Sequence, residues 1–294
     1  MNALRLGPVG IWSAQLRFGD PVQALEAAAE LDELGFGALW VPDIGGPVLE
    51  TVRSLLGATS RAVIATGILN VWMHAAAEVA EGHAEIEREH PGRFLLGLGI
   101  SHAPVVDADE PGRYRRPLTT MREYLDALDA APAGPPRPRV LAALGPKMVA
   151  LAGERTDGIH PYLVPVEHTA LVREALGPNR IVAPALSVVL EADRHRALDI
   201  ARADIGAMYL GLPNYTNNWL RLGFTEDDLA GGGSDRLLEA LYALGSAEQI
   251  AERVRAHLDA GADHVCVRAI TAHADDATRL PVEDWRELAP ALLS

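Results

Sequence analysis

The sequence predicts an α/β protein, a (β/α)8 TIM barrel with insertions, formed by a chain of 294 residues. Short apolar runs alternate with helical segments along the chain, and eight such repeats can be counted. Several of the apolar runs are followed at once by polar residues, and barrels hold their ligands at the carboxyl ends of their strands. No low-complexity linker divides the repeats, so we expect residues 1–294 to form a single domain.

The predicted elements follow the period and the punctuation of the sequence. The first predicted helix has Asp20 as its N-cap, Pro21 in its first turn and Gly35 just after its end. The same reasoning predicts strands at 9–12, 38–41, 62–71, 94–99, 140–143, 158–163, 181–190 and 264–270. It predicts helices at 21–34, 47–59, 75–89, 118–130, 147–155, 167–175, 193–208 and 247–260.

The stretch GRFLLGLGISH, residues 92–102, is typical of a fully buried parallel strand with a site at its end. Its apolar run ends in Gly97 and Gly99, which allow another group to approach the backbone closely. Ser101 and His102 then lie just past the strand, where α/β proteins place ligands. The alternative is an ordinary loop in which the glycines only turn the chain.

Two long connections interrupt the regular alternation, at about 103–138 and 209–245. In the first, residues 103–117 and 132–138 flank a predicted helix. The segment 209–233 is rich in Tyr, Asn, Trp and Leu, whereas disordered segments are poor in aromatic residues. Because long connections in compact domains are usually functional, we expect this insertion to be an ordered cover or a subunit contact.

Composition and charge exclude several classes of protein. A net charge of −14 argues against nucleic acid and anionic membranes as partners. We see no apolar run of about 18 residues that would span a membrane, and no signal peptide in MNALRLGPVGIW. The single cysteine, Cys266, lies in an apolar run and is interpreted as a packing residue. A cytoplasmic protein fits these features.

Polar residues after the second and third predicted strands are candidates for the site. Asp43 follows the second strand and is either a site residue or a loop cap. Asn70 lies inside an apolar run, and a buried amide needs a partner, which a ligand in the barrel mouth could provide.

The segment Gly145-Pro146-Lys147 predicts a small anion site after the fifth strand. Gly145 permits close approach and Pro146 suits the first turn of a helix, so free N–H groups and the helix dipole would face the anion. Lys147 adds a positive charge nearby. A plain helix cap with a solvated lysine is the alternative.

Three histidines near predicted strand ends, His74, His102 and His160, are candidates for acid–base work or for polar ligand contacts. A metal site is the competing interpretation, but the chain has no HxH, HxxxH or HExxH spacing, so we predict no metal. The glycine pair at 97 and 99 lacks the third glycine and the acidic residue of a dinucleotide fingerprint.

The chain resembles the bacterial luciferase-like monooxygenase superfamily, and within it the actinobacterial oxidoreductases that use the deazaflavin coenzyme F420. The segments that carry the resemblance cover the chain nearly end to end. They are ALWVPD (38–43), IATGILNVW (64–72), GRFLLGLGISHAP (92–104), RVLAALGPKMVALAGERTDGIHPYLVP (139–165), LPNYTNNWLRLGFTEDDLAGGGSDRL (212–237) and AGADHVCVR (260–268).

The resemblance implies a bacterial luciferase-like barrel with F420, or alternatively FMN, lying across the strand ends. A bulge of the third strand, often with a non-prolyl cis peptide, would support the ring; it maps to the region from Gly67 to Asn70, and we place the cis bond at Leu69–Asn70. Gly99, Ser101 and His102 would face the ring edge. The ribityl phosphate would be held by Ala143, Leu144, Gly145, Pro146 and Lys147. His160 and Tyr162 would lie near the cofactor tail or the substrate.

The implied chemistry is hydride transfer between the deazaflavin and a carbon of a small organic substrate. We expect His102 or Asp43 to shuttle the accompanying proton. One departure leaves the acid–base group open, because many members have histidine after the acidic residue of the second strand, whereas Asp43 is followed by Ile44-Gly45-Gly46.

Other functions remain open at this point. An FMN-dependent monooxygenase on the same fold is one alternative, and a barrel without cofactor that only binds a partner is another. A metal hydrolase barrel is a more distant one. The resemblance also implies a homodimer, to which the aromatic insertion could contribute.

Overall fold

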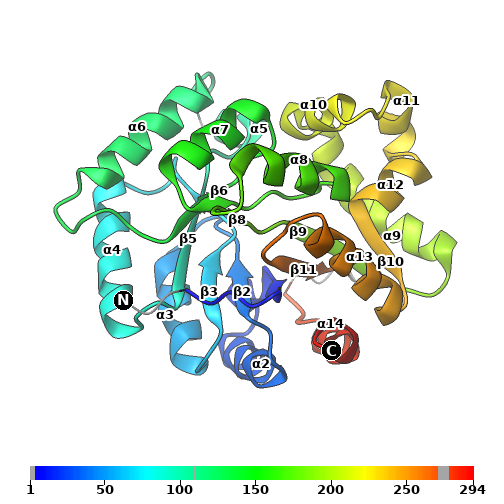
Figure 1. The fold of residues 1–294 in the computed structure, drawn as a ribbon, viewed down its shortest axis with the longest axis horizontal. Helices are drawn as coiled ribbons and strands as arrows, with labels where there is room; N and C mark the ends of the chain where they lie inside the picture. The colour runs from blue at the N-terminus through cyan, green and yellow to red at the C-terminus, as the bar shows by residue number, and fades with distance from the viewer. Residues whose placement is uncertain (1–3, 109, 271–277) are drawn as a thin grey trace.

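A computed structural model describes residues 4–108, 110–270 and 278–294 of the chain (Figure 1). Its strands all run parallel and belong to a single curled sheet. The strands are β1 (Val9–Trp12), β2 (Ala38–Val41), β3 (Val63–Thr66), β4 (Leu69–Asn70), β5 (Phe94–Gly99), β6 (Arg139–Leu141), β7 (Gly158–Ile159), β8 (Ile181–Val182), β9 (Ala185–Leu190), β10 (Tyr242–Gly245) and β11 (Val265–Ala269).

The sheet closes on itself, which confirms the predicted barrel. β1 pairs with β2 on one side and with β11 on the other, and β11 pairs with β9. β8 runs directly into β9 and pairs with β7, and a bridge between Tyr162 and Ala185 extends this pairing. The eight predicted strands therefore form the ring, the third being split into β3 and β4 and the seventh into β8 and β9.

The strand β10 was not predicted. It pairs with β9 from Ser187 to Leu190. The bridge between Tyr162 and Ala185, which joins β9 to the segment after β7, lies just before this pairing begins. The predicted strand at 158–163 is also shorter than expected, because regular pairing covers only β7 and the isolated bridge at Tyr162.

The eight predicted helices are all present, each within one residue of the predicted ends. Asp20 caps α2 by accepting hydrogen bonds from the N–H groups of Val22 and Gln23, and Gly35 ends it with φ of 107°. These helices are α2 (Pro21–Leu34), α3 (Val48–Ala58), α4 (Ala76–Glu89), α6 (Pro117–Asp129), α7 (Pro146–Arg155), α8 (Val166–Leu176), α9 (Arg194–Ala207) and α13 (Ala247–Asp259).

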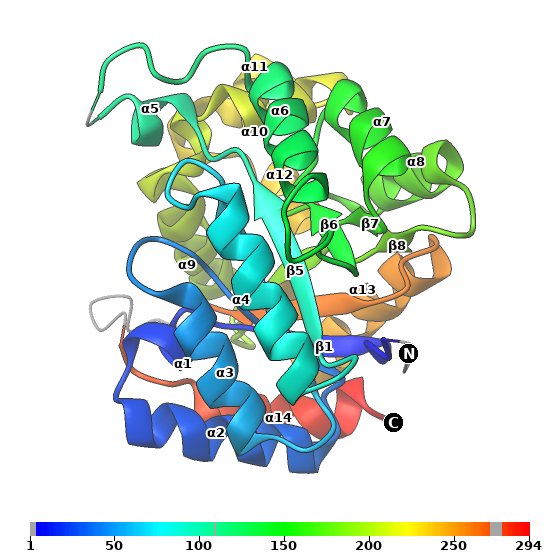
Figure 2. The ribbon, with the colours of Figure 1, turned by 90° about the vertical axis from the view of Figure 1, so that its left-hand side faces the viewer.

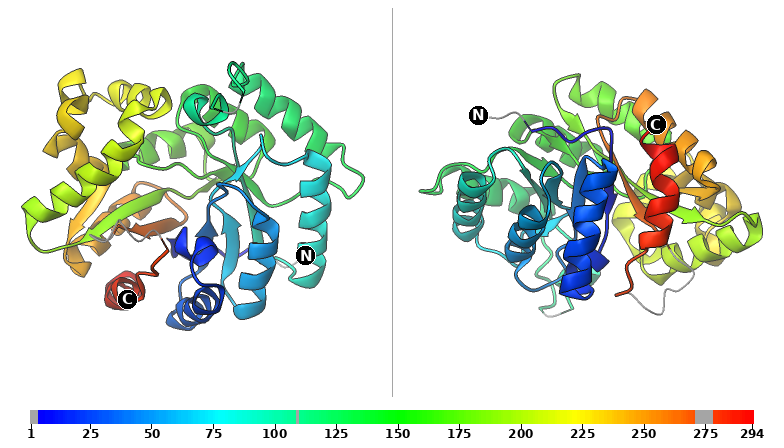
Figure 3. Two further views of the ribbon diagram at one scale, coloured as in Figure 1. Left: turned by 180° about the vertical axis from the view of Figure 1, so that it is seen from behind. Right: turned by 90° about the horizontal axis from the view of Figure 1, so that it is seen from below.

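Further helical segments were not predicted. Two are short turns at strand ends, α1 (Gln15–Phe18) and α5 (Ala103–Val106), and α14 (Val282–Leu292) packs beside α2 and α13. The insertion at 209–245 is ordered and largely helical. It consists of η1 (Tyr209–Gly211), α10 (Pro213–Arg221), α11 (Glu226–Leu229), η2 (Ala230–Gly232), α12 (Asp235–Leu241) and β10. Together with α9, its helices gather on one side of the barrel (Figure 3).

Alternation along the strands divides the core into an inner and an outer layer. On β2, Leu39 and Val41 pack in the outer layer with the surrounding helices, whereas Ala38 and Trp40 join the cluster inside the barrel. Helices α3 and α4 cover the outer face of the strands beside β5 (Figure 2). Cys266 is fully buried in the inner cluster, as predicted for a packing residue.

Candidate functional site

The floor of the barrel is formed by stacked aromatic and imidazole rings. The ring of His160 lies 4.1 Å from that of Trp40, centroid to centroid and nearly parallel, and its Nδ1 is 2.8 Å from the carbonyl oxygen of Ala183. Trp40 Nε1 donates to His264 Nε2 at 3.1 Å. Burial lowers the pKa of His160 and of His264 to about 4, so both rings are neutral at pH 7. His160, a predicted cofactor contact, is thus placed in this floor and is 3% exposed.

The predicted bulge of the third strand is present, but the predicted cis bond at Leu69–Asn70 is wrong. The cis peptide joins Gly67 to Ile68, where the chain leaves β3 before resuming as β4. Trp12 Nε1 donates to the carbonyl oxygen of Gly67 at 2.8 Å. A Cβ on Gly67 would lie 2.7 Å from the same nitrogen, so this position requires glycine.

The glycines of β5 are approached closely, as predicted, Gly97 by the backbone carbonyl of Thr66 and Gly99 by the side chain of Ile68. A Cβ on Gly99 would lie 2.3 Å from Ile68 Cδ1. Ile68, which the sequence reasoning did not single out, therefore lies against β5 at the point where the predicted ring support was expected. Leu69 instead belongs to the outer core and has no exposed surface.

Asp43 is the centre of a hydrogen-bonded network behind the strand ends. Its side chain is fully buried. Oδ2 accepts from the backbone N–H of Asn70 at 3.0 Å and contacts His74 Nε2 at 2.7 Å, and Oδ1 lies 3.2 Å from Arg17 Nη1. Because the carboxylate has no exposed surface, it can affect a ligand only through these neighbours.

Arg17, on the short helix α1, was not recognised from the sequence. Its guanidinium donates to the carbonyl oxygens of Pro42, Gly45 and Gly46 as well as to Asp43. It therefore ties the loop after β2 to the connection after β1. A single arginine in a polar connection carries no sequence signal for such a role, since the fold alone brings Asp43 and these backbone carbonyls to it.

The predicted pair Ser101 and His102 lies at the end of β5. Ser101 has φ of 56°, an uncommon conformation for a residue other than glycine. The ring of His102 lies 5.5 Å from that of Tyr215, and its Nδ1 is buried without a partner among the described residues. Burial lowers the pKa of His102, which favours the neutral ring.

The 209–245 insertion brings an aromatic cluster against the end of β7. Tyr209 and Tyr215 each make edge-to-face contacts with Tyr162, at centroid distances of 5.4 and 6.3 Å. Tyr215 also packs against Trp219, whose Nε1 donates to the carbonyl oxygen of Leu163 at 2.9 Å. The insertion is thus an ordered cover for this side of the strand ends, one of the two roles expected for it.

A charged pair lies beside this cluster. Arg268 on β11 forms an ion pair with Asp204 of α9 at 2.8 Å and donates to Tyr162 Oη at 2.6 Å. Its guanidinium lies over the ring of Trp12, 5.6 Å from the centroid, and Tyr242 donates to the same carboxylate. The network joins β1, β10, β11 and the segment after β7 to α9.

The predicted anion site is at the start of α7. Gly145 is its N-cap and Pro146 its first residue, while Lys147 is exposed. A Cβ built on Gly145 would lie 3.8 Å from Arg221 Nη2, so the insertion places a guanidinium beside this helix terminus. This arginine was not singled out from the sequence, because its proximity to Gly145 depends on how α10 packs.

The segment before α7 is held from behind by α8. His168 Nε2 lies 3.1 Å from the carbonyl oxygen of Leu144, and Ala143 is buried in the outer core. Arg221 Nη2 donates to Asn218 Oδ1 at 2.7 Å. Asn218 is 1% exposed, and its Nδ2 is buried without a partner among the described residues.

Most of the predicted site residues therefore follow the carboxyl ends of the barrel strands, but three of them, His160 in the floor and Leu69 and Ala143 in the outer core, are buried. Several large apolar side chains follow the same strand ends and are exposed to solvent. They are Phe18, Ile44, Met73 and Val105.

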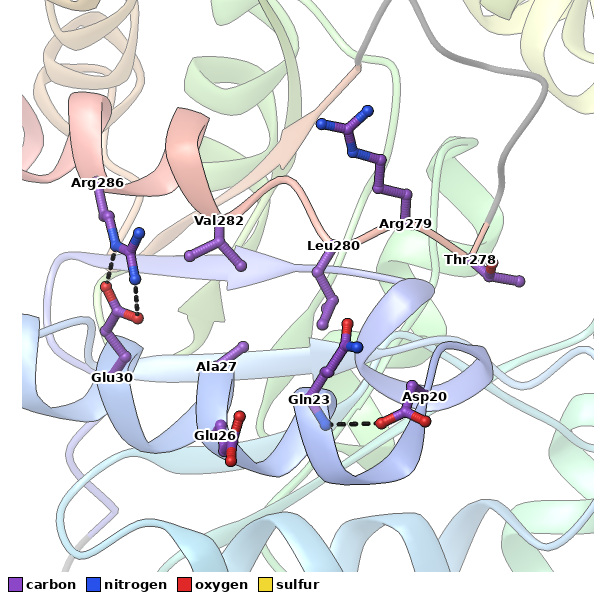
Figure 4. Close-up of a pocket in the computed structure, with 10 residues that line it drawn as sticks. All are labelled: Asp20, Gln23, Glu26, Ala27, Glu30, Thr278, Arg279, Leu280, Val282 and Arg286. Atoms are coloured by element: carbon purple, nitrogen blue, oxygen red, sulfur yellow. Dashed lines mark hydrogen bonds and ion pairs between the residues drawn. The ribbon is translucent and has the colours of Figure 1, made fainter.

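Two pockets lie away from the strand ends. One, of about 470 Å³, is on the outside of the barrel between α2 and the segment leading into α14 (Figure 4). Its charged lining includes Glu30, which pairs with Arg286, and Asp20, which caps α2. The other, of about 320 Å³, lies between β10 and α13.

The structure describes residues 4–108, 110–270 and 278–294. None of the helices there is long and apolar enough to cross a membrane. Within the same ranges no three side chains of His, Cys, Asp or Glu come close enough together to hold a metal ion.

Comparison with known proteins gives a family and a fold. A profile described as luciferase-like monooxygenase matches residues 8–264. A putative coenzyme F420-dependent oxidoreductase of Mycobacterium tuberculosis is 27% identical over 168 residues, which cover 56% of this chain and 46% of that protein. The chain thus matches about half the length of this relative.

Solved structures of similar fold contain different cofactors. An F420-dependent secondary alcohol dehydrogenase in complex with an F420–acetone adduct has a TM-score of 0.73 at 18% identity, covering 97% of this chain and 99% of that one. The FMN-bound oxygenating constituent of 3,6-diketocamphane monooxygenase from Pseudomonas putida has a TM-score of 0.67 at 14% identity, covering 97% and 96%. Both confirm the predicted fold.

Proposed function

Because this chain belongs to the luciferase-like monooxygenase family and is therefore an enzyme, we propose that it transfers a hydride between coenzyme F420 and a small organic substrate. The observation that carries the proposal is the pairing of the α7 N-terminus with Arg221. A cofactor that carries a phosphate needs an anion-binding site of this kind at the strand ends.

The residues at this anion-binding site fit the phosphate of such a cofactor. Pro146 has no N–H and the N–H groups of Met148 and Val149 donate to the carbonyl oxygen of Gly145, so the first turn of α7 offers an anion the N–H of Lys147 together with the helix dipole. The guanidinium of Arg221 is a second donor suited to an anion. The Nδ2 of Asn218, buried without a partner in the described part of the chain, is a further donor close to Arg221. Ala143, Leu144 and Pro146 would form the backbone of the anion-binding site, and Lys147 would add a positive charge at its edge.

A planar ring would rest against the strand ends on Ile68 and Asn70. The orphaned Nδ1 of His102 is a polar contact available to the ring edge or to the substrate. When bound, the deazaflavin supplies the site that accepts or gives the hydride. We assign the accompanying proton to His102 or to the network of Asp43, and we expect His102→Ala or Asp43→Ala to change cofactor binding or turnover.

The test is a titration of the purified protein with F420 and, separately, with FMN, followed by the fluorescence of each cofactor. We expect saturable binding of F420 and weaker binding of FMN. Reduction of F420 would then be measured with a panel of small secondary alcohols, beginning with 2-propanol, in the presence and absence of oxygen. Preferential FMN binding with oxygen consumption would instead indicate a monooxygenase, and failure to bind either would indicate a barrel with a binding role.

Three predictions from the sequence join this proposal. We propose that the chain is one domain, that it forms a homodimer, and that it works in the cytoplasm. Light scattering of the eluting protein checks the dimer, and limited proteolysis checks the single domain through the absence of a stable smaller fragment.

A further inference from the structure

We propose that His74, oriented by Asp43, is the side chain that exchanges the proton at the mouth of the barrel, and that Asp43 is a positioning residue. This inference rests on the proposed function, because it names the acid–base group of the same site.

The carboxylate of Asp43 has the geometry of a group that orients a histidine. Its Oδ2 contacts Nε2 of His74 at 2.7 Å and also accepts the N–H of Asn70, while its Oδ1 faces Arg17 at 3.2 Å. The carboxylate is therefore held from three sides and has no exposed surface. Such a partner fixes the ring orientation and makes Nε2 the protonated nitrogen of the neutral imidazole.

The other nitrogen of the ring is free to exchange a proton. Nδ1 of His74 makes no hydrogen bond to any residue that the structure describes, and the side chain is 21% exposed. In the neutral tautomer that Asp43 selects, Nδ1 is an acceptor, and in the imidazolium it is a donor. A buried carboxylate behind a partly exposed imidazole is the arrangement that general acid–base catalysis uses.

His74 lies close to the predicted ring position. It shares the acceptor Oδ2 with the N–H of Asn70, and Asn70 is opposite Gly99 in the register of β4 and β5. The exposed apolar side chains of Ile44 and Met73 flank the network. A substrate resting on this rim would approach Nδ1 from the solvent side.

Charged and titratable groups reach the network from several elements. Arg17 comes from α1 and Asp43 from the loop after β2, and Glu78 lies in the first turn of α4. Tyr124 of α6 is held neutral, because burial first and then the charges of Glu78 and Asp43 raise its pKa. Among these groups the imidazole of His74 is the one that combines partial exposure with a ring nitrogen not engaged by Asp43.

The proposed reaction couples the transfer of a hydride to the transfer of a proton. When bound in its reduced form, the deazaflavin would supply the hydride to the carbon of a polar double bond in the substrate, whose π electrons would move to the heteroatom. That atom takes the proton from Nδ1–H of the His74 imidazolium, which becomes neutral and regains a proton from water. The reverse reaction returns the proton to Nδ1.

The experiment begins with the protein free of cofactor and labelled with ¹⁵N-histidine. Long-range ¹H–¹⁵N spectra should show His74 as the Nε2–H tautomer in the native protein and as a mixture of tautomers in Asp43→Asn. His74→Gln assigns the signal. His195→Gln, at an exposed position of α9, is the matched control and should leave the His74 signal unchanged.

Addition of F420 should then shift the His74 signals but not those of His195. An Asp43→Asn variant with an unchanged His74 tautomer, or F420 binding that leaves the His74 signals in place, would overturn the proposal. If native protein does not bind F420 at all, the proposed function fails instead, whatever the tautomer. The two failures are therefore distinguishable without any turnover.

Kinetics on the loaded enzyme supply the second readout. We expect His74→Gln to lower the rate of hydride transfer roughly 100-fold or more, with F420 affinity changed less than about threefold. Asp43→Asn should lower the same rate by roughly tenfold and alter its pH profile, whereas His195→Gln should keep both. A His74→Gln enzyme that binds F420 and keeps the native rate would refute the assignment in favour of His102.

Discussion

The floor and the rim of the barrel use histidine in opposite ways. In the floor, His160 and His264 are buried between aromatic rings and backbone carbonyls, and no carboxylate of the described residues bonds to either ring. At the rim, His74 is held by the carboxylate of Asp43 and keeps one nitrogen toward solvent. The floor environment lowers the pKa of both rings and keeps them neutral, whereas at the rim a carboxylate orients the ring of His74. The difference teaches that burial alone makes these histidines structural, whereas a carboxylate partner together with solvent access makes one of them able to exchange protons.

The largest expected effect is a loss of stability when the stacked rings in the floor of the barrel are disturbed. Trp40→Ala removes a fully buried ring that stacks on His160 and donates to His264. We expect the free energy of unfolding to fall by about 3–5 kcal/mol, measured by urea denaturation. Trp40→Phe keeps a ring but loses the N–H, and should cost about 1 kcal/mol beyond its smaller volume. Equal losses for both variants would contradict a stacking role.

The next prediction tests whether the partly buried ion pair of Arg268 and Asp204 at the rim stabilises the fold. Asp204→Asn leaves the guanidinium of Arg268 without its ion-pair partner, and we expect a loss of about 3 kcal/mol in the free energy of unfolding. The exposed pair of Arg122 and Glu154 is the control, since Glu154→Gln should change stability by less than about 1 kcal/mol. Similar losses in both variants would show that the Arg268 pair is no more than a surface contact.

The pH dependence of stability tests the floor histidines directly. Their pKa values of about 4 lie below the unfolded value near 6.5. Between these values the unfolded chain binds more protons, so the free energy of unfolding falls as the pH is lowered from about 6.5 to about 4. Each histidine contributes up to about 1.4 kcal/mol per pH unit in that window. His264→Gln should reduce the slope, and a native slope of zero would contradict neutral floor histidines.

The smallest expected effect is a change in F420 binding at the rim that leaves stability nearly unchanged. Arg221→Met removes the guanidinium beside Gly145, and we expect the Kd for F420 to rise about tenfold, with the free energy of unfolding nearly unchanged. Arg194→Met on the exposed start of α9 is the control and should leave the Kd as it is. An unchanged Kd in Arg221→Met would place the phosphate elsewhere.

The elements of the barrel could be predicted because each depends on a local pattern. The capped start of α2 and its closing Gly35 mark a helix in any surroundings, and the alternation of apolar runs with helices gives the ring. The extra strand β10 was missed, because its pairing with β9 depends on an insertion folding back. The cis bond was placed two residues too late, because Gly67 is selected by the indole of Trp12, which is distant in the sequence.

The sequence predicts the candidate site only as a set of residues that lie at or just after the carboxyl ends of strands. Asp43, Asn70, Gly99, Ser101 and Gly145 follow from that rule. Which of them faces a ligand does not follow, because a change of one residue in strand register turns a side chain from the opening to the helix layer. Leu69 and Ala143 show this, since both are near strand ends and both pack in the outer core.

By itself, the sequence determined the barrel, its helix boundaries and the turn-like segments at its carboxyl face, because periodicity and caps act within a few residues. Only the tertiary structure decided that Asp43 is buried behind His74, that Ile68 covers Gly99, and that Arg221 reaches the start of α7. These are contacts between segments far apart in the chain. Their geometry arises from the packing of whole strands and helices, and no local pattern encodes it.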